Sequence, residues 1–568
     1  MKRIFRPLPL ATSALLAAVT VPADVYIWSN PAGGAFEEPS NWLVGASFQS
    51  LNVVPCIEVA GGTVPATCPG SGDSILFCPG TYTITLAEDH AVTDIDLSTG
   101  TDEIREWTGH AVFFPTIDLG KHTLTASRRV DVSLRTPQYF NGDPEEFGSL
   151  TFVNGTIVCN GAAMQCGDED ANNTGASGFG AGVCWGQNWF DRVRGHLVVG
   201  DGATANVASA WTMGYNAGIR VADGGSLNVS GWMHSHHRAI EHLAISGEGA
   251  TAAIDTFNVS GQTKTNIVEN GANVSIGQIR WGYWWGEGGN ALIVRSGATL
   301  SLSRQNEWES WAEQTDSIHD SLVLVTGKGS TLSIPEGSAF QFGNRNNDVD
   351  QTLRVADGGA VRGPQSARII IGRGPGCTGN RLDVDNGIVE IGKIHFGDNW
   401  QVWDFAPDGP YYGYASNGVL RVAGAAPLVH ATAQGWDGGG HMLFEGTINL
   451  DFDATLQFDI PAAGWATAPV QVDTRLWAAP STIPGYEDAP SCRLVVNALD
   501  YARAHPGEKV VLVQTVVDST AAFTELIENA TFPDTAGTAF LGTVEIADEG
   551  RQLVYTSPNS NTTVVLIR

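Results

Sequence analysis

A long central part of the chain repeats one short pattern, and each repeat contains a glycine at the same place. An apolar-x-apolar run leads into a turn pair ending in that glycine, and a second alternating run follows, as in "RVADGGSLNV" and "LIVRSGATLSL". The aligned glycines are Gly202, Gly224, Gly249, Gly271, Gly297, Gly329, Gly358 and Gly387. Successive glycines lie 22 to 32 residues apart. Similarity at this spacing indicates a solenoid, because one repeat cannot bury its apolar face alone and must stack on its neighbours.

The residues within one repeat predict short strands separated by tight turns. In Leu353-Arg354-Val355, apolar and polar side chains alternate, as in a strand with one buried face. The Asp-Gly, Asn-Gly or Ser-Gly pair that follows supplies a positive φ at little cost. A third strand often ends in an aromatic or apolar residue before a glycine, as in "WTMGY" and "KIHFG".

Three short strands per 22–32-residue coil predict an all-β protein built as a right-handed parallel β-helix. The alternative is a β-sandwich of hairpins, since an Asp-Gly pair between two strands also indicates a hairpin. The repeated three-strand unit and its nearly constant length favour the solenoid.

Residues 1–23 have the composition of a secretory signal peptide. A basic start precedes an apolar run, and "VPA" at positions 21–23 supplies small residues for cleavage before Asp24. The apolar run is too short to span a bilayer, and no later segment offers about 18 uninterrupted apolar residues. We therefore expect a secreted protein, extracellular or at the cell surface, that does not insert into a membrane.

The remaining chain divides into three regions. Residues 24–194 are expected to form a β-rich, disulfide-containing N-terminal cap with the first coils, and residues 195–449 the β-helix repeats. Residues 450–568 predict a small α+β C-terminal capping domain that covers the open edge of the last coil. Within it, "DSTAAFTELIENA" predicts a helix with Asp518 or Ser519 as its N-cap.

The composition of the chain indicates which compartment and which kinds of partner to expect. Acidic residues outnumber basic ones by 60 to 31, which gives a net charge of −29 and argues against a nucleic-acid partner. In an exported chain, an even number of cysteines predicts disulfides whose pairing the sequence does not reveal. These cysteines are Cys56, Cys68, Cys78, Cys159, Cys166, Cys184, Cys377 and Cys492. Glycans, other surface or matrix proteins, and further copies of the chain are the partners that we expect.

Two parts of the chain resemble known extracellular proteins. One set of residues follows a W…NW…PC…GD…F order: Trp28, Asn41, Trp42, Pro55, Cys56, Gly72, Asp73 and Phe77. This order resembles the N-terminal module of secreted β-solenoid proteins and of amnionless-like and mastigoneme-type proteins. The repeats resemble the Gly-rich arrays of autotransporter-passenger-like surface proteins. That resemblance implies a surface role, but the α+β pattern of residues 450–568 departs from the membrane-anchoring barrel of that family.

Four histidines, His234, His236, His237 and His242, fall within nine positions of one repeat. On a strand, His234 and His236 share a face, whereas His237 faces the other way or lies in the turn. Neighbouring repeats fill this slot with "WTMGYNAG" and "FNVSGQTKTN", so our main interpretation is a polar flank of a loop. A transition-metal or catalytic role, and contact with a sugar or a protein, remain the alternatives.

Aromatic residues gather at the same slot of successive repeats, where the coils would stack them into one strip. The members are Trp185, Trp189, Trp211, Tyr215, Trp232, Trp281, Tyr283, Trp284, Trp285, Trp308, Trp311, Trp400 and Trp403. Packing in the core is the main interpretation, although adjacent tryptophans point in opposite directions if extended. The alternative is a face that binds sugar rings or a partner. Its ligand-binding residues would be Trp232, His234, His236, His237, Trp281, Trp284, Trp285, Trp308 and Trp311.

A loop beside two cysteines offers oxygen ligands for Ca²⁺. Asp168, Asp170 and Asn172 lie two positions apart, a spacing that suits this cation. The match to a calcium loop is partial, because Asn173 and Phe179 stand where glycine and glutamate would be needed. A solvated acidic loop is the alternative, and no cofactor is required.

Catalytic residues, if the chain is an enzyme, would be Glu241, His236, Asp191 and Arg192, which lie near the aromatic strip. The sequence as a whole favours a structural or adhesive solenoid that presents a Trp/His-rich face to glycans or partner proteins. The alternative is a β-helix carbohydrate-active enzyme, either a polysaccharide lyase or a glycoside hydrolase.

Overall fold

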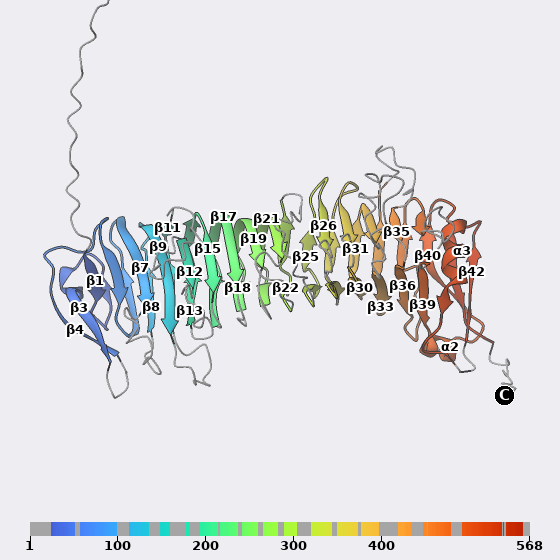
Figure 1. Cartoon of the computed structure of the whole chain (residues 1–568), viewed down its shortest axis with the longest axis horizontal. Coiled ribbons are helices and arrows are strands. Elements are labelled where there is room, and N and C mark those ends of the chain that lie inside the picture. Colours follow the sequence, from blue (N-terminus) through green and yellow to red (C-terminus); the bar gives the residue numbers. More distant parts are fainter. Residues whose placement is uncertain are drawn as a thin grey trace, which may run out of the picture.

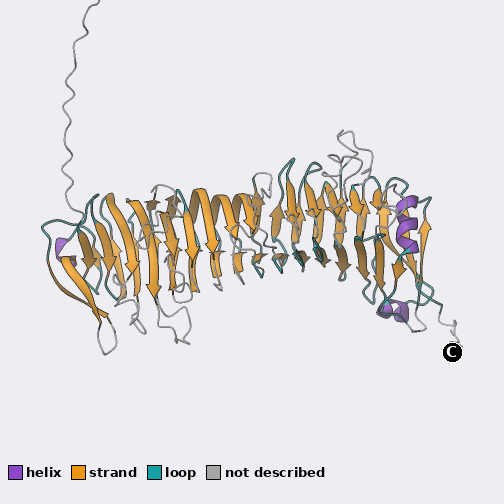
Figure 2. Ribbon diagram, in the orientation of Figure 1, coloured by secondary structure: helices purple, strands orange, loops and turns teal. Residues whose placement is uncertain are grey.

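The computed structural model is an elongated all-β molecule whose strands run across its long axis (Figure 1). The structure describes residues 24–50, 57–98, 113–135, 148–159, 178–181, 193–213, 216–236, 241–259, 265–281, 289–303, 320–342, 349–372, 377–396, 418–433, 447–450, 453–478, 491–536, 538 and 541–559. Long parallel sheets make this a β-solenoid, as the repeat predicted. Helices α2 (Leu499–Ala504) and α3 (Thr520–Glu528) lie at its C-terminal end (Figure 2).

One face of the solenoid, face B, is a continuous parallel sheet in which each strand pairs with the next. Its strands are β2 (Gly34–Ala35), β6 (Gly80–Thr85), β8 (Phe113–Asp118), β10 (Ser149–Val153), β13 (Val193–Val199), β16 (Asn216–Val221), β18 (Glu241–Ser246), β20 (Thr265–Glu269), β22 (Ala291–Arg295), β24 (Leu322–Thr326), β27 (Thr352–Ala356), β30 (Arg381–Asp385), β33 (Val419–Ala423), β36 (Thr455–Asp459), β39 (Arg493–Asn497) and β41 (Ala530–Thr531).

A second parallel sheet, face A, follows face B in each repeat after a short turn. Its strands are β7 (His90–Ser98), β9 (Thr123–Arg135), β11 (Thr156–Cys159), β14 (Thr204–Val207), β17 (Ser226–His236), β19 (Thr251–Val259), β21 (Asn273–Trp281), β23 (Thr299–Leu302), β25 (Thr331–Ser333), β28 (Ala360–Arg362), β31 (Ile388–Ile391), β34 (Leu428–Ala431), β37 (Val470–Val472) and β40 (Lys509–Thr515).

A third set of strands, face C, continues the chain after face A. In the first half of the rod it consists of β1 (Val25–Trp28), β5 (Ser74–Phe77), β12 (Gly178–Ala181) and β15 (Ala210–Met213), together with the later residues of β7, β9, β17, β19 and β21. In the second half it is a separate parallel sheet of β26 (Ala339–Phe342), β29 (Arg368–Ile371), β32 (Lys393–Phe396), β35 (Ile448–Leu450) and β38 (Leu476–Ala478).

The interior of the rod is a stack of apolar side chains in register. On face B, the ladder contains Leu353, Leu382, Leu420, Leu456 and Leu494, each at most 1% exposed. Strands in a sheet lie about 4.8 Å apart, so each leucine packs on the one below it. Burying one such side chain stabilises the fold by about 1.5–3 kcal/mol, which explains why each repeat needs its neighbours.

The turn from face B to face A confirms most of the glycine alignment and corrects one position. The seven aligned glycines from Gly202 to Gly358 all have φ between 66° and 87°. In the last repeat, Asn386 takes the positive φ of 55°. A Cβ on Gly387 would lie 2.3 Å from the carbonyl oxygen of Val355, a close approach that excludes any side chain. The turn that contains Asn386 is one residue shorter than the turn of the preceding repeat. Gly387 therefore takes the place of the second glycine in the Gly-Gly pair of that repeat.

Both ends of the rod depart from parallel pairing. At the N-terminal end, the 3-10 helix η1 (Pro39–Asn41) precedes β3 (Trp42–Ser50), which pairs antiparallel with β1 and with β4 (Ile57–Thr63). At the C-terminal end, β43 (Gln552–Thr556) pairs antiparallel with β40 and with β42 (Thr543–Ala547). Between these ends, strands on both sides of residues 195 and 449, where we expected boundaries between regions, pair in parallel.

Helix α3 confirms the helix predicted near the C-terminus, and it packs against β38. Ser519 is the N-cap residue, but its side chain accepts no hydrogen bond from the first turn. Asp518 supplies one instead, because its Oδ1 accepts the backbone N–H of Thr520 at 2.8 Å. Both residues proposed from the sequence therefore lie at the helix start, with different roles.

The predicted disulfides are not supported by the described cysteines. Cys68 and Cys78 carry free thiols, and none of the described cysteines is bonded to another. The Cys78 side chain points into the core, where its Sγ lies 3.6 Å from the hydroxyl of Tyr82. Burial raises the pKa of the Cys78 thiol, which makes it unreactive. Cys56, Cys166 and Cys184 lie outside the described residues.

Candidate functional site

Four side chains form a column along the outside of face C. Trp211, His234, Asn258 and Arg280 lie in register on β15, β17, β19 and β21. The residues that precede them in the chain point the other way, into the hydrophobic core: Ala210, Met233, Phe257 and Ile279. The column therefore faces away from the interior of the coils.

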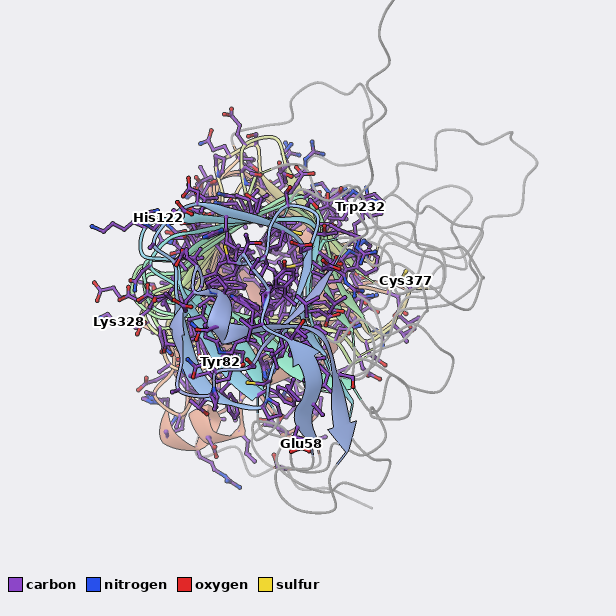
Figure 3. The ribbon with its side chains drawn as sticks, turned by 90° about the vertical axis from the view of Figure 1, so that its left-hand side faces the viewer. Glu58, Tyr82, His122, Trp232, Lys328 and Cys377 are labelled. Carbon is purple, nitrogen blue, oxygen red and sulfur yellow. The ribbon has the colours of Figure 1, made fainter. Side chains whose placement is uncertain are left out.

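Two tryptophans flank His234 in this column. The rings of Trp211 and His234 stack, with centroids 4.0 Å apart and an interplanar angle of 24°. Both side chains are buried, although neither belongs to the core of the coil. Trp232 lies two residues before His234 on the same strand, with ring centroids 5.5 Å apart, and is 42% exposed. Viewed along the rod, Trp232 lies on the outer surface (Figure 3). His122 and Lys328, which lie at the turns from face B to face A, are on the opposite side of the rod.

Arg280 connects this column to the exposed tryptophan. Its Cζ lies 5.5 Å from the centroid of the Trp232 ring, within the range of a cation–π interaction. Nε and Nη2 of Arg280 both donate to Oε1 of Gln278, at 3.3 and 3.2 Å. The guanidinium is thus fixed beside the indole, and the pair presents an aromatic ring and a positive charge on one outer surface.

His234 is held in its neutral form. Burial, with a smaller contribution from the positive charge of Arg280, lowers the pKa of His234 to about 3. The side-chain amide nitrogen of Asn258 lies 3.2 Å from Nδ1 of the imidazole, which accepts its hydrogen bond. At neutral pH, His234 therefore orders the column as an uncharged ring between Trp211 and Asn258.

The column continues toward the N-terminal end as a charged cluster. The column that contains Trp211 continues, one coil at a time, through Gly180 to Asp131 and Asp96. Both carboxylates are buried. Nη2 of Arg129 donates to Oδ2 of Asp96 at 2.9 Å. The column on the outer side of face C thus runs over seven rungs, from Asp96 to Arg280.

Sequence reasoning missed a second histidine–asparagine pair on face C. His395 on β32 lies in register with Asn449 on β35, and the Asn449 amide nitrogen is 3.4 Å from Nδ1 of His395. Burial, together with Lys393 and Arg368, lowers the pKa of His395 to about 3. The available signal was the position of His395 in "KIHFG", the third-strand slot in which His234 also lies.

The structure describes only some of the residues proposed from the sequence. Trp232 and His234 lie side by side on β17, and both point outward from the coil. His236 ends β17, Trp281 ends β21 and Glu241 begins β18, and the structure describes only their backbone. The others lie outside the described residues: Asp168, Asp170, Asn172, Asp191, Arg192, His237, Trp284, Trp285, Trp308 and Trp311.

Among the described residues, no group of three His, Cys, Asp or Glu side chains is arranged to hold a metal ion. No described helix is long and apolar enough to cross a membrane.

Fold and site together define a β-solenoid that carries a polar and aromatic column on one outer face. Comparison of the chain with protein-family models, curated proteins and solved structures finds no match. Its function must therefore be argued from its own residues.

Proposed function

We propose that this protein is a secreted or cell-surface β-solenoid with a structural and adhesive role, which presents face C to glycans or partner proteins. The observation that supports this most is the exposed indole of Trp232 with Arg280 fixed beside it. An exposed aromatic ring is the side chain that most often stacks on a sugar ring or anchors a protein partner. A cation beside it adds attraction for an acidic group.

The finer architecture that we propose is a right-handed coil with three strands, capped at both ends. The pairing of β27, β28 and β29 with β30, β31 and β32 supports three strands per coil. The antiparallel strands at each end would cover the first and last coils and prevent edge-to-edge association. Residues 1–23 would direct export and be removed.

A binding assay with Trp232→Ala tests this function. The full chain is applied to an array of neutral and acidic glycans and to glycan-coated cells, with Leu541→Ala as the control. Leu541 is 54% exposed and lies at the C-terminal end of the rod, away from Trp232, so its variant also loses an exposed apolar side chain. We expect Trp232→Ala to weaken binding at least about tenfold, as loss of an interface anchor does. Equal binding by both variants would reject the role of Trp232.

One observation favours the enzymatic alternative. His236 ends β17 and Glu241 begins the next strand, β18, so the two residues are close in the chain. A histidine and a carboxylate at one site are the groups that general acid–base cleavage of a polysaccharide uses. In a depolymerisation screen, cleavage that is abolished in both His236→Ala and Glu241→Ala would replace the adhesive role. Wild-type protein that cleaves nothing in the screen would leave the adhesive role in place.

A further inference from the structure

One rung of the core ladder on face B carries a polar side chain. Asn266 on β20 lies in register between Leu243 on β18 and Leu292 on β22. Both leucines belong to the hydrophobic core, and Asn266, which occupies the same inward position, is 0% exposed. Farther along this ladder in either direction, the residues are Ile219 and Val323. Asn266 therefore interrupts a column that is otherwise apolar over these coils.

The side-chain amide of Asn266 is poorly satisfied in this position. Its Nδ2 donates to the carbonyl oxygen of Ala291 at 3.4 Å, whereas such bonds are usually about 2.9 Å long. Its Oδ1 is buried and accepts no hydrogen bond from a described residue. The two leucines next to it in the ladder have no polar side-chain atom to offer. Since a buried polar group without a partner has lost its hydrogen bonds to water, the stack of coils is weaker here than at a rung filled by leucine.

The pairing between strands is also narrower at this place, which lies near the middle of the rod (Figure 1). Strand β21 pairs with β19 from Asn273 to Trp281, but with β23 only from Asn273 to Ile276. The described strands of face C form two separate sheets, of which the first reaches β21 and the second begins at β26. In the described part of the chain, the coil of β22 and β23 is therefore joined to the coil of β20 and β21 through faces A and B alone.

We propose that the interface between the coil of β20 and β21 and the coil of β22 and β23 is a joint at which the rod opens. The stability of a repeat array is the sum of its coils and of the interfaces between neighbours, so local opening begins at the weakest interface. Asn266 and the narrower pairing of β21 weaken the same interface. The part of the rod up to β21 and the part from β22 onward then act as two separate cooperative units.

Opening at the joint changes the length of the rod. A closed coil adds about 4.8 Å to the rod, the distance between neighbouring strands. Gly297 and Gly329, which mark the next repeat, lie 32 residues apart. An extended chain of that length spans on the order of 100 Å. Release of one coil therefore lengthens a molecule that is pulled at its ends, while the coils on either side stay folded. The joint does not depend on what the Trp232 site binds, so it goes beyond the function proposed above.

Hydrogen exchange of the full-length protein under native conditions tests the joint. We expect the amides of β20 to β23 to exchange at least about tenfold faster than those of β16 and β27, and Asn266→Leu to remove most of this difference. Asn266→Val is a smaller replacement, like Val323 in the same ladder, and should act in the same direction. The matched control is Asn273→Leu, the same substitution at an exposed position of β21, which should leave exchange unchanged.

Pulling single full-length molecules by their two ends tests the change in length. The first event should lengthen the molecule by about one coil, and Asn266→Leu should move this event to a higher force. Three results would overturn the proposal: exchange of β20 to β23 as slow as that of β16 and β27, wild-type exchange in both Asn266 variants, or unravelling that starts from an end of the rod. Trp232→Ala should change neither measurement, so failure of the glycan-binding function would be seen separately.

Discussion

Face C contains two histidine–asparagine pairs in the same backbone arrangement, and their surroundings differ. His234 stacks on Trp211 and has a tryptophan and an arginine beside it. His395 lies among cations, and its Nε2 has no hydrogen-bond partner among the described residues. The solenoid thus provides the same polar pair twice, and the side chains of adjacent rungs give each pair different surroundings.

The largest expected difference between the two pairs is in packing. Trp211→Ala should cost about 3 kcal/mol of local stability, because it removes a buried indole from the His234 ring. Trp477→Ala should cost less, since Trp477 is only partly buried. Hydrogen exchange of β15–β17 and of β35–β38 measures each local loss separately, as is required in a repeat array. A larger loss for Trp477→Ala would reverse our view of which pair is packed.

Acid should destabilise both pairs. An unfolded histidine takes up a proton near pH 6.5, whereas burial keeps His234 and His395 neutral in the folded protein down to about pH 3. The unfolded chain therefore binds more protons in this window. Stability is complete above about pH 6.5 and is lost progressively as the pH falls toward 3. Thermal unfolding across this range should decline less steeply in a His234→Gln/His395→Gln double variant, and an equal decline would contradict the prediction.

The two asparagines should contribute less to stability, and their contributions should differ. Asn258→Ala removes the amide that donates to His234 at 3.2 Å and should cost about 1 kcal/mol, the usual contribution of one hydrogen bond. Asn449→Ala removes a longer contact of 3.4 Å and should have a smaller effect. Hydrogen exchange of β17 and β32 provides the comparison. Equal effects of both substitutions would show that the two pairs are equivalent.

Arg280→Gln should have the smallest effect. Arg280 is the second cause of the low pKa of His234, after burial, so its removal should raise that pKa only slightly. The pKa of His395 should stay unchanged, which makes His395 an internal reference in the same NMR titration. A large rise in the pKa of His234 would mean that charge rather than burial keeps it neutral.

The sequence predicted the repeated framework because short-range rules determine it. Alternation and turn chemistry identified the strands of faces A and B, and seven of the eight glycines aligned from the sequence have the expected positive φ. The direction of Trp211 and Trp232 could not be predicted, because the corner between faces A and C interrupts the alternation. In β17, the register shifts between Val229 and Trp232, and a shift by one residue exchanges inside and outside.

The second pair could not be found for a different reason. In "KIHFG", His395 is a lone polar residue in an apolar strand, and nothing in that segment indicates a binding role. Its significance depends on Arg368 and Asn449, which lie in other coils and reach it only through stacking. These residues come together because the coils stack in a fixed register. That register cannot be calculated from the sequence, since the coils and their connecting segments differ in length.

The regular spacing of the strands also determines how far apart the two histidines lie. Six strand-to-strand steps separate the rung of His234 from that of His395, which places them about 29 Å apart along the rod. A partner that contacts both pairs at once must therefore extend at least about 29 Å along the rod. The number of coils between the two pairs thus sets the minimum length of such a partner.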